Sequence, residues 1–155
     1  MGYIPKGEND LKISTKGRYA LRMLLDLAEH KDDGFISLQE IAERQNVSKQ
    51  YLEQIVSLLN TSNILRTNRG KYGGYMLANK PSSYTVGQVL RITEGSLAPV
   101  ACLDDAINQC DRSRFCKTLP MWTGLKRVIA EYLESVTLQD MLDASLEQNT
   151  ANYVI

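Results

Sequence analysis

The strongest constraint on the fold comes from two amphipathic segments joined by a very short turn. Residues 36–45, ISLQEIAERQ, contain Ser37 and, three residues later, Glu40, which is the capping-box pattern of a helix start. After the turn NVS, Ser48 precedes a longer segment whose apolar residues recur at helical steps, namely Leu52, Ile55, Val56 and Leu59. A short helix, a tight turn and a longer helix predict a helix-turn-helix.

A further amphipathic helix is predicted ahead of this pair, over residues 14–30. Ser14 or Thr15 can cap its first turn, and Gly34 can prevent the helix from continuing beyond residues 30–33. Its apolar positions also follow the helical period: Ala20, Met23, Leu24, Leu27 and Ala28. The front of the chain is therefore expected to contain three packed helices.

Residues 64–77, ILRTNRGKYGGYML, alternate apolar and polar side chains on both sides of a glycine-rich centre. This pattern predicts a β-hairpin, with Gly73 and Gly74 expected to supply the positive φ angles of its turn. The hairpin is basic, because the sequence has no Asp or Glu between Asn60 and Lys80. A helix-turn-helix followed by a basic hairpin is a winged helix. The alternative is a solvated, charged hairpin beside a helical bundle.

Charge is unevenly distributed, although the chain is formally neutral. Residues 12–80 carry eleven Lys and Arg against seven Asp and Glu, whereas residues 81–155 carry six against nine. A basic front half joined to an acidic back half is typical of a DNA-facing module followed by a part with another role.

The second helix of the pair is narrow enough to enter the major groove of DNA. Its outward side chains suit phosphates and base edges, and the residues predicted to contact DNA are Ser48, Lys49, Gln50, Tyr51, Glu53 and Gln54. Among them, Glu53 can accept from cytosine or take part in a surface salt bridge. In the hairpin, Arg69 is expected to enter an adjacent minor groove, with Lys71 as a further contact.

The back half is predicted to be helical around one irregular loop. A short helix follows Thr85 and ends at Gly95, and a long helix begins near Thr118 and Pro120. The long helix carries an apolar seam at steps of three and four: Trp122, Leu125, Ile129, Tyr132 and Val136. This seam can pack on its own domain or, as we predict, against a second copy in a homodimer. A short closing helix is expected over residues 137–145.

The predicted fold class is mainly α with a small β-hairpin wing: a winged helix-turn-helix plus a long C-terminal dimerisation helix. The expected parts are an N-terminal extension (1–11), a DNA-binding domain (12–80), a sensing loop and dimerisation helix region (81–145) and a loose C-terminal tail (146–155). No apolar run approaches the ~20 residues that cross a membrane, and the N-terminus does not read as a secretion signal. We expect a cytoplasmic protein without membrane contact.

All three cysteines, Cys102, Cys110 and Cys116, lie within one stretch of fifteen residues. A zinc site usually needs four ligands in close pairs, and the sequence has no such pairs. The single histidine, His30, has no sequence reason to meet the thiols, and no other catalytic set occurs, so we do not expect an enzyme. Three thiols on one loop can hold a metal group such as an iron–sulfur cluster, act as a redox switch, or be structural.

Three segments, KISTKGRYAL, QYLEQIVSLL and NRGKYGGYML, resemble the signature segments of a bacterial winged-helix regulator family that includes IscR, NsrR and CymR. The resemblance runs from about Leu11 to Asp143. It implies a homodimer that binds double-stranded, palindromic promoter DNA and usually acts as a repressor. Matched residue by residue, it also implies that Glu53 and Gln54 read bases and that Arg69 enters the minor groove.

The resemblance places the cysteine loop where cluster-binding members carry their cysteines, which implies an iron–sulfur cluster on Cys102, Cys110 and Cys116. The cluster type and the fourth ligand stay open, because Leu119 stands where IscR-like members have histidine and Arg18 where NsrR-like members have aspartate. The first cysteine spacing is also seven residues instead of five. A cluster-free thiol sensor is one alternative. Another is a cofactor-free regulator similar to CymR, controlled by a partner metabolic enzyme or a metabolite.

Overall fold

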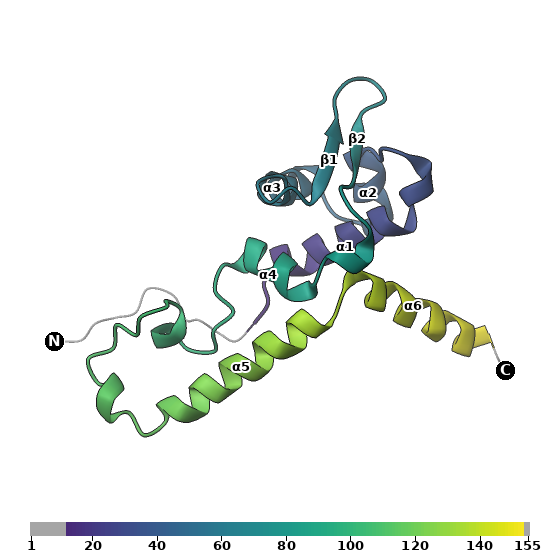
Figure 1. Cartoon of the computed structure of the whole chain (residues 1–155). Helices are drawn as coiled ribbons and strands as arrows, with labels where there is room; N and C mark the ends of the chain where they lie inside the picture. The colour runs from purple at the N-terminus through teal and green to yellow at the C-terminus, as the bar shows by residue number, and fades with distance from the viewer. Residues whose placement is uncertain (1–11, 154–155) are drawn as a thin grey trace.

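A computed structural model describes residues 12–153 of the chain (Figure 1). The front half contains α1 (Thr15–Glu29), α2 (Leu38–Gln45), α3 (Lys49–Asn60), β1 (Leu65–Asn68) and β2 (Gly74–Leu77). The back half contains α4 (Val86–Glu94), α5 (Leu119–Ser135) and α6 (Leu138–Tyr153). Short 3₁₀ turns join these elements: η1 (Lys31–Asp33), η2 (Pro81–Ser83), η3 (Ala101–Leu103) and η4 (Ser113–Phe115). The predicted N-terminal extension, residues 1–11, lies outside the described residues.

The core forms around α1, whose apolar stripe contacts α2, α3, α4 and β2. Met23, Leu24 and Leu27 of α1 are almost fully buried, and they belong to one cluster with the buried residues of the following helices. These partners include Ile41, Leu52, Ile55 and Leu59, and Ile64 just before β1 joins the same cluster. Truncating one such residue to alanine typically costs ~2–5 kcal/mol. The cluster therefore holds α1, α2 and α3 in one arrangement.

The serines predicted as caps hold both helices of the central pair. Ser37 Oγ accepts from the Glu40 N–H (3.2 Å), and the Glu40 carboxylate accepts from the Ser37 N–H (2.9 Å), which completes the capping box. Ser48 Oγ accepts from the Tyr51 N–H (3.1 Å) at the start of α3. Between them Asn46 has a left-handed φ of 52° and ends α2. The predicted helix-turn-helix is confirmed.

The predicted hairpin is also confirmed, and it is attached to the helix-turn-helix. β1 and β2 pair antiparallel, from Leu65 opposite Leu77 to Asn68 opposite Gly74. Ile36, just before α2, exchanges two backbone hydrogen bonds with Tyr75 of β2, at 2.9 and 2.8 Å. Because this bridge joins the hairpin to the start of α2, the wing cannot turn independently of the helix pair.

The glycines of the hairpin act differently from the prediction. Among them, the positive φ falls on Gly70 (114°) and not on Gly73 or Gly74. A Cβ at Gly74 would overlap the backbone carbonyl of Ile36, and a Cβ at Gly73 would overlap the carbonyl oxygen of Asn68. These two glycines are thus required for close backbone approach, and Gly70 alone supplies the left-handed turn residue.

The end of α5 is anchored to the start of α4 and to the buried core. The Val86 N–H donates to the Val136 carbonyl (2.8 Å), and the Leu138 N–H donates to the Tyr84 carbonyl (3.0 Å). Leu138, the first residue of α6, is fully buried in the core. By contrast, the start of α5 and the loop before it lie far from this junction, as Figure 1 shows.

Two details of the back half correct the sequence-based predictions. Thr118 precedes α5 without a side-chain cap, and its hydroxyl contacts Cys116 Sγ instead (3.4 Å). The closing helix predicted over residues 137–145 continues to Tyr153, so most of the expected loose tail is helical. The reason is that the sequence contains no Gly or Pro after Gly124 that could end the helix. No helix within residues 12–153 has the length and apolarity needed to cross a bilayer.

Candidate nucleic-acid interface and cysteine loop

The outward face of α3 carries four of the predicted DNA-contacting side chains. Lys49, Gln50, Glu53 and Gln54 are all exposed, while the opposite face of the helix is buried in the core. The Ser48 hydroxyl is also exposed and already accepts the first-turn hydrogen bond of α3. The face therefore presents an ammonium group, two amides and a carboxylate, which together can contact phosphates and base edges.

Tyr51 occupies a different position from its neighbours on α3. It is half-buried, and its ring forms a T-shaped contact with the ring of Tyr19 from α1, at a centroid distance of 5.8 Å and an interplanar angle of 83°. The guanidinium of Arg22 lies 4.8 Å from the centre of the Tyr19 ring. Tyr51 thus joins α3 to α1 as well as lying next to the exposed face.

The tip of the wing brings together its predicted basic residues. Arg69 and Lys71 are exposed between the ends of β1 and β2. Beside them Tyr72 is 84% exposed, and the Lys71 ammonium lies 5.6 Å from its ring centre. Sequence reasoning missed Tyr72. The available signal was an aromatic residue inside a glycine-rich turn, where a hydrophobic core position is not expected.

A buried carboxylate fixes α2 against α1, and sequence reasoning missed this residue too. Asp26 is 2% exposed and accepts from Arg44 Nε (3.0 Å), Arg44 Nη2 (2.6 Å) and Gln45 Nε2 (2.9 Å). Arg22 extends the network, because it donates to the side chain and the carbonyl of Gln45. The available signal was a carboxylate three residues after Met23 in the apolar stripe of α1.

The three cysteines lie on the loop between α4 and α5 as free thiols. Cys102 and Cys116 are half-buried, and Cys110 is exposed. Across residues 12–153, no three His, Cys, Asp or Glu side chains come together in a group able to hold a metal ion. The chemistry of three thiols fits an iron–sulfur cluster, but this conformation of the loop does not gather them into a cluster site.

Cys116 has an environment that favours its thiolate. A hydrogen bond with the Thr118 hydroxyl lowers the pKa of the Cys116 thiol, and the N–H groups of Thr118 and Leu119 act in the same direction. These N–H groups belong to the start of α5, where the helix dipole also favours negative charge. Cys116 is therefore suited either to metal ligation or to reaction with an oxidant.

The long helix α5 has an uncovered apolar face. No α5 residue is buried. Of the predicted seam only Tyr132 is exposed, whereas Trp122, Leu125, Ile129 and Val136 are half-buried within the single chain. Met121 is 53% exposed, Val128 is 54% exposed and Tyr132 is 67% exposed. An amphipathic helix normally buries such a face against another element.

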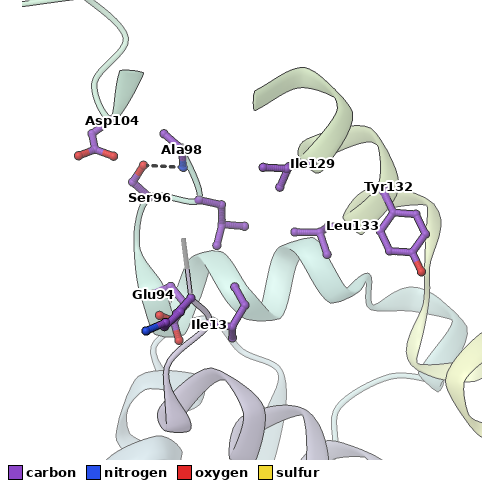
Figure 2. A pocket seen from close by; sticks show the side chains of 10 residues that line it. Ile13, Glu94, Ser96, Ala98, Asp104, Ile129, Tyr132 and Leu133 are labelled. Carbon is purple, nitrogen blue, oxygen red and sulfur yellow. Dashed lines mark hydrogen bonds between the residues drawn. The ribbon is translucent and has the colours of Figure 1, made fainter. Parts of the chain in front are cut away.

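A cavity of about 550 Å³ lies between the segment before α1, the end of α4, the loop that follows it and α5 (Figure 2). Ile13, Ile129 and Leu133 contribute apolar side chains to its lining, and Glu94 contributes a carboxylate. The cavity thus separates the segment before α1 from the second half of α5.

The comparisons with known proteins agree with this arrangement. Residues 13–144 match the Rrf2 family, described as iron-dependent transcriptional regulators. The chain is 38% identical over 131 residues to the transcriptional regulator CymR of Bacillus subtilis, covering 84% of this chain and 89% of CymR. It is 34% identical over 145 residues to IscR of Yersinia pseudotuberculosis, covering 90% of this chain and 87% of IscR.

Solved structures give the same result. The B. subtilis CymR structure, described as that of the global cysteine regulator, superposes with a TM-score of 0.70 at 35% identity, over 86% of this chain and 97% of CymR. The IscR structure from T. potens gives a TM-score of 0.68 at 36% identity, over 86% and 88% of the two chains. These superpositions confirm the predicted winged helix-turn-helix. The relatives are named as transcriptional regulators, which confirms the prediction that the protein is not an enzyme. The chain belongs to the Rrf2 family of transcriptional regulators.

Proposed function

We propose that the protein is a homodimeric repressor that binds palindromic promoter DNA through α3 and the wing. The observation that supports this most strongly is the pairing of an exposed polar face on α3 with an exposed basic tip on the attached hairpin. An α-helix fits the major groove, and a wing arginine fits a neighbouring narrow minor groove. Family membership implies DNA binding for this chain, and α3 with the wing is the surface suited to it.

Replacing single side chains on this surface should separate affinity from sequence preference. A duplex enriched by the wild-type protein from a random-sequence pool serves as the probe. We expect Arg69→Ala to lower affinity for it by about tenfold, because a groove contact is lost. We expect Glu53→Ala to change which base is preferred at one position of each half-site, since a carboxylate accepts selectively from cytosine.

The matched control for the lost charge is Arg127→Ala, because Arg127 lies on α5 and is 72% exposed. It should leave affinity within about twofold of wild type. Fluorescence anisotropy titrations at fixed ionic strength measure affinity, and repeated enrichment measures preference. Wild-type affinity and preference in both surface variants would contradict the assignment of Arg69 and Glu53.

We further propose that the loop from Cys102 to Cys116 is the sensing element and holds an iron–sulfur cluster. Support comes from the three thiols on one loop and from the family description as iron-dependent. Cluster binding requires the loop to rearrange, because in its present conformation the three thiols do not form a group that could hold a metal ion. The fourth ligand is not assigned.

A thiol-free protein provides a sharp test, because the sequence contains no cysteine outside the loop. We expect wild-type protein purified without oxygen to contain iron and sulfide and to absorb visible light. The variant with Cys102, Cys110 and Cys116 replaced by alanine should contain neither and should lose the change in DNA affinity on exposure to oxygen. A colourless wild-type protein free of iron and sulfide, prepared under strict anaerobiosis, would overturn the cluster proposal.

One observation favours a second candidate, a cluster-free thiol sensor that acts through Cys116. Its pKa is lowered by the hydrogen bond with Thr118 and by the start of α5, so its thiolate is available to oxidants. In that case Cys116→Ala alone should abolish the oxidant response of metal-free protein, and mass spectrometry should find the oxidised product on Cys116. A cofactor-free regulator similar to CymR, controlled by a partner enzyme or a metabolite, predicts that the thiol-free variant responds as wild type.

A further inference from the structure

Helix α4 connects α5 to α1, which packs against α2 and α3. α5 packs on α4, and α4 packs on α1. The cavity of Figure 2 lies between the segment just before α1 and the second half of α5, with Ile13 on one side and Ile129 and Leu133 on the other. A displacement in this part of α5 therefore reaches the start of α1 through α4.

The contact between α5 and α4 includes one carboxylate, that of Glu134, which binds residues at both ends of α4. It accepts from the hydroxyl of Thr85, the N-cap of α4, at 2.9 Å. It also forms an ion pair with Arg91 in the last turn of α4, and hydrogen bonds from Arg91 and Thr85 lower the pKa of Glu134. Gly87 leaves the necessary room, since a Cβ there would lie 2.5 Å from Glu134 Oε1.

The contact between α4 and α1 has the same design. Glu94 is the last residue of α4, and its Oε1 accepts from the Ser14 hydroxyl (2.5 Å) and from the Gly17 N–H (3.1 Å). These donors are the N-cap and first turn of α1, where a carboxylate is electrostatically favoured. A Cβ at Gly17 would lie 2.5 Å from Glu94 Oε1, so this glycine also makes room for a carboxylate from the next helix.

We propose that Glu134 and Glu94 are positioning residues that act in series and transmit the position of α5, through α4, to α1 and the DNA-binding surface. The proposal rests on the proposed function, because it explains how the cysteine loop at the start of α5 could influence DNA binding. Beyond α1 the path is continuous, since Tyr19 contacts Tyr51 of α3 and Asp26 binds Arg44 of α2.

The fold itself does not depend on these carboxylates. The end of α5 is held independently by the backbone bonds of Val136 and Leu138 and by the burial of Leu138. Both Arg91 and Glu134 are at least 40% exposed. Alanine variants of the two glutamates are therefore expected to fold, with thermal midpoints close to that of the wild type.

The test combines an NMR reporter with a double-mutant cycle. The amide signal of Gly17 reports directly on the Glu94 contact, and operator affinity is measured on the duplex enriched by the wild-type protein. We expect Glu134→Ala to shift the Gly17 amide signal, although Glu134 contacts α4 and not α1, and to lower affinity about fivefold. Glu94→Ala should do the same, and the double variant should be no weaker than the weaker single variant, as for residues in one series.

Glu131→Ala is the matched control, because Glu131 lies one turn earlier on α5 and pairs within the helix with Arg127. It should change neither readout. The proposal is overturned if the Gly17 signal responds to Glu134→Ala no more than to Glu131→Ala, or if the two losses of affinity multiply in the double variant.

Glu134→Ala could also alter the dimer. In that case the affinity of Glu94→Ala, compared with wild type, decides whether the α4–α1 contact affects DNA binding, and the Gly17 signal still decides whether Glu134 is coupled to α1. If the wild-type protein enriches no duplex, the proposed function fails, whereas the Gly17 signal still tests the series.

Discussion

Aspartate at both Val128 and Tyr132 is expected to convert the protein to a monomer and to lower its affinity for a two-half-site duplex by at least about 100-fold. The two residues are one helical turn apart on α5, and both are more than half exposed in a single chain. In a twofold interface each substitution is present once in each chain, so the two substitutions would place four carboxylates in the apolar interface. Losing the partner removes the effective concentration that links the two half-sites, typically worth 10²–10⁴ in affinity.

Ala130→Asp is the matched control, because residue 130 is exposed on the opposite side of α5 and receives the same charge. It should remain dimeric and bind DNA as wild type. Sedimentation velocity measures the oligomeric state, and anisotropy titrations compare duplexes with one and two half-sites. For the doubly substituted protein, affinity for the single half-site should change little. A doubly substituted protein that remains a dimer with full affinity would show that α5 is not the dimer interface.

The local parts of the fold could be predicted because their causes lie within a few residues. Ser37 and Glu40 form a capping box in the structure as their spacing predicts, and Ser48 caps α3. The alternation over residues 64–77 likewise predicts the hairpin, since the period of a strand is local. Such features depend on neighbours in the sequence, and they can therefore be predicted without knowledge of the tertiary structure.

Features that depend on distant partners could not be predicted in this way. Gly74 is required because Ile36, 38 positions earlier, approaches its backbone, and a turn-based interpretation of the glycine pair missed this. The glutamates at 94 and 134 also appear as ordinary surface acids in the sequence, and only the structure places them against Gly17 and Gly87. Sequence patterns state which residues are apolar or charged, but long-range contacts decide which of these have a partner.

The candidate site shows the same division. The exposed face of α3 follows from the helical period, so Glu53 and Gln54 could be placed on it from the sequence. The half-buried contact of Tyr51 with Tyr19 could not, because it joins two helices. For the cysteine loop, the irregular backbone between α4 and α5 gives no period, and so the sequence gives no basis for placing the three thiols relative to one another.

The second large effect is expected at Asp26, where Asp26→Asn should lower the free energy of unfolding by about 3 kcal/mol at neutral pH. The carboxylate is 2% exposed and accepts two hydrogen bonds from Arg44 and one from Gln45. An asparagine amide offers one oxygen, so its NH₂ group would face the guanidinium and leave a buried donor unpaired. Since the Arg44 side chain is 34% exposed, water stabilises part of its charge, and the expected loss is at the low end for a buried pair.

Glu131→Gln is the control for a surface ion pair, because Glu131 and Arg127 are 68% and 72% exposed and 3.8 Å apart. It should cost no more than about 0.5 kcal/mol. Urea unfolding at one fixed chain concentration measures both variants, so that any dimer contributes equally. A loss at Asp26→Asn as small as that of the control would contradict a structural role for the buried carboxylate.

The pH dependence separates the charge of Asp26 from its shape. Burial raises the pKa of Asp26, but hydrogen bonds from Arg44 and Gln45 outweigh burial, so the pKa lies below its ordinary value. As pH falls, the unfolded chain therefore takes up this proton first, and the stabilisation is present above about pH 5 and lost as pH falls through the lowered pKa. The stabilities of wild type and Asp26→Asn should accordingly converge between about pH 5 and pH 2. Other carboxylates with a lowered pKa, such as Glu40 and Asp140, titrate in both proteins and cancel in the difference. A difference in stability that stays constant over this range would mean that the negative charge of Asp26 does not stabilise the contact between α1 and α2.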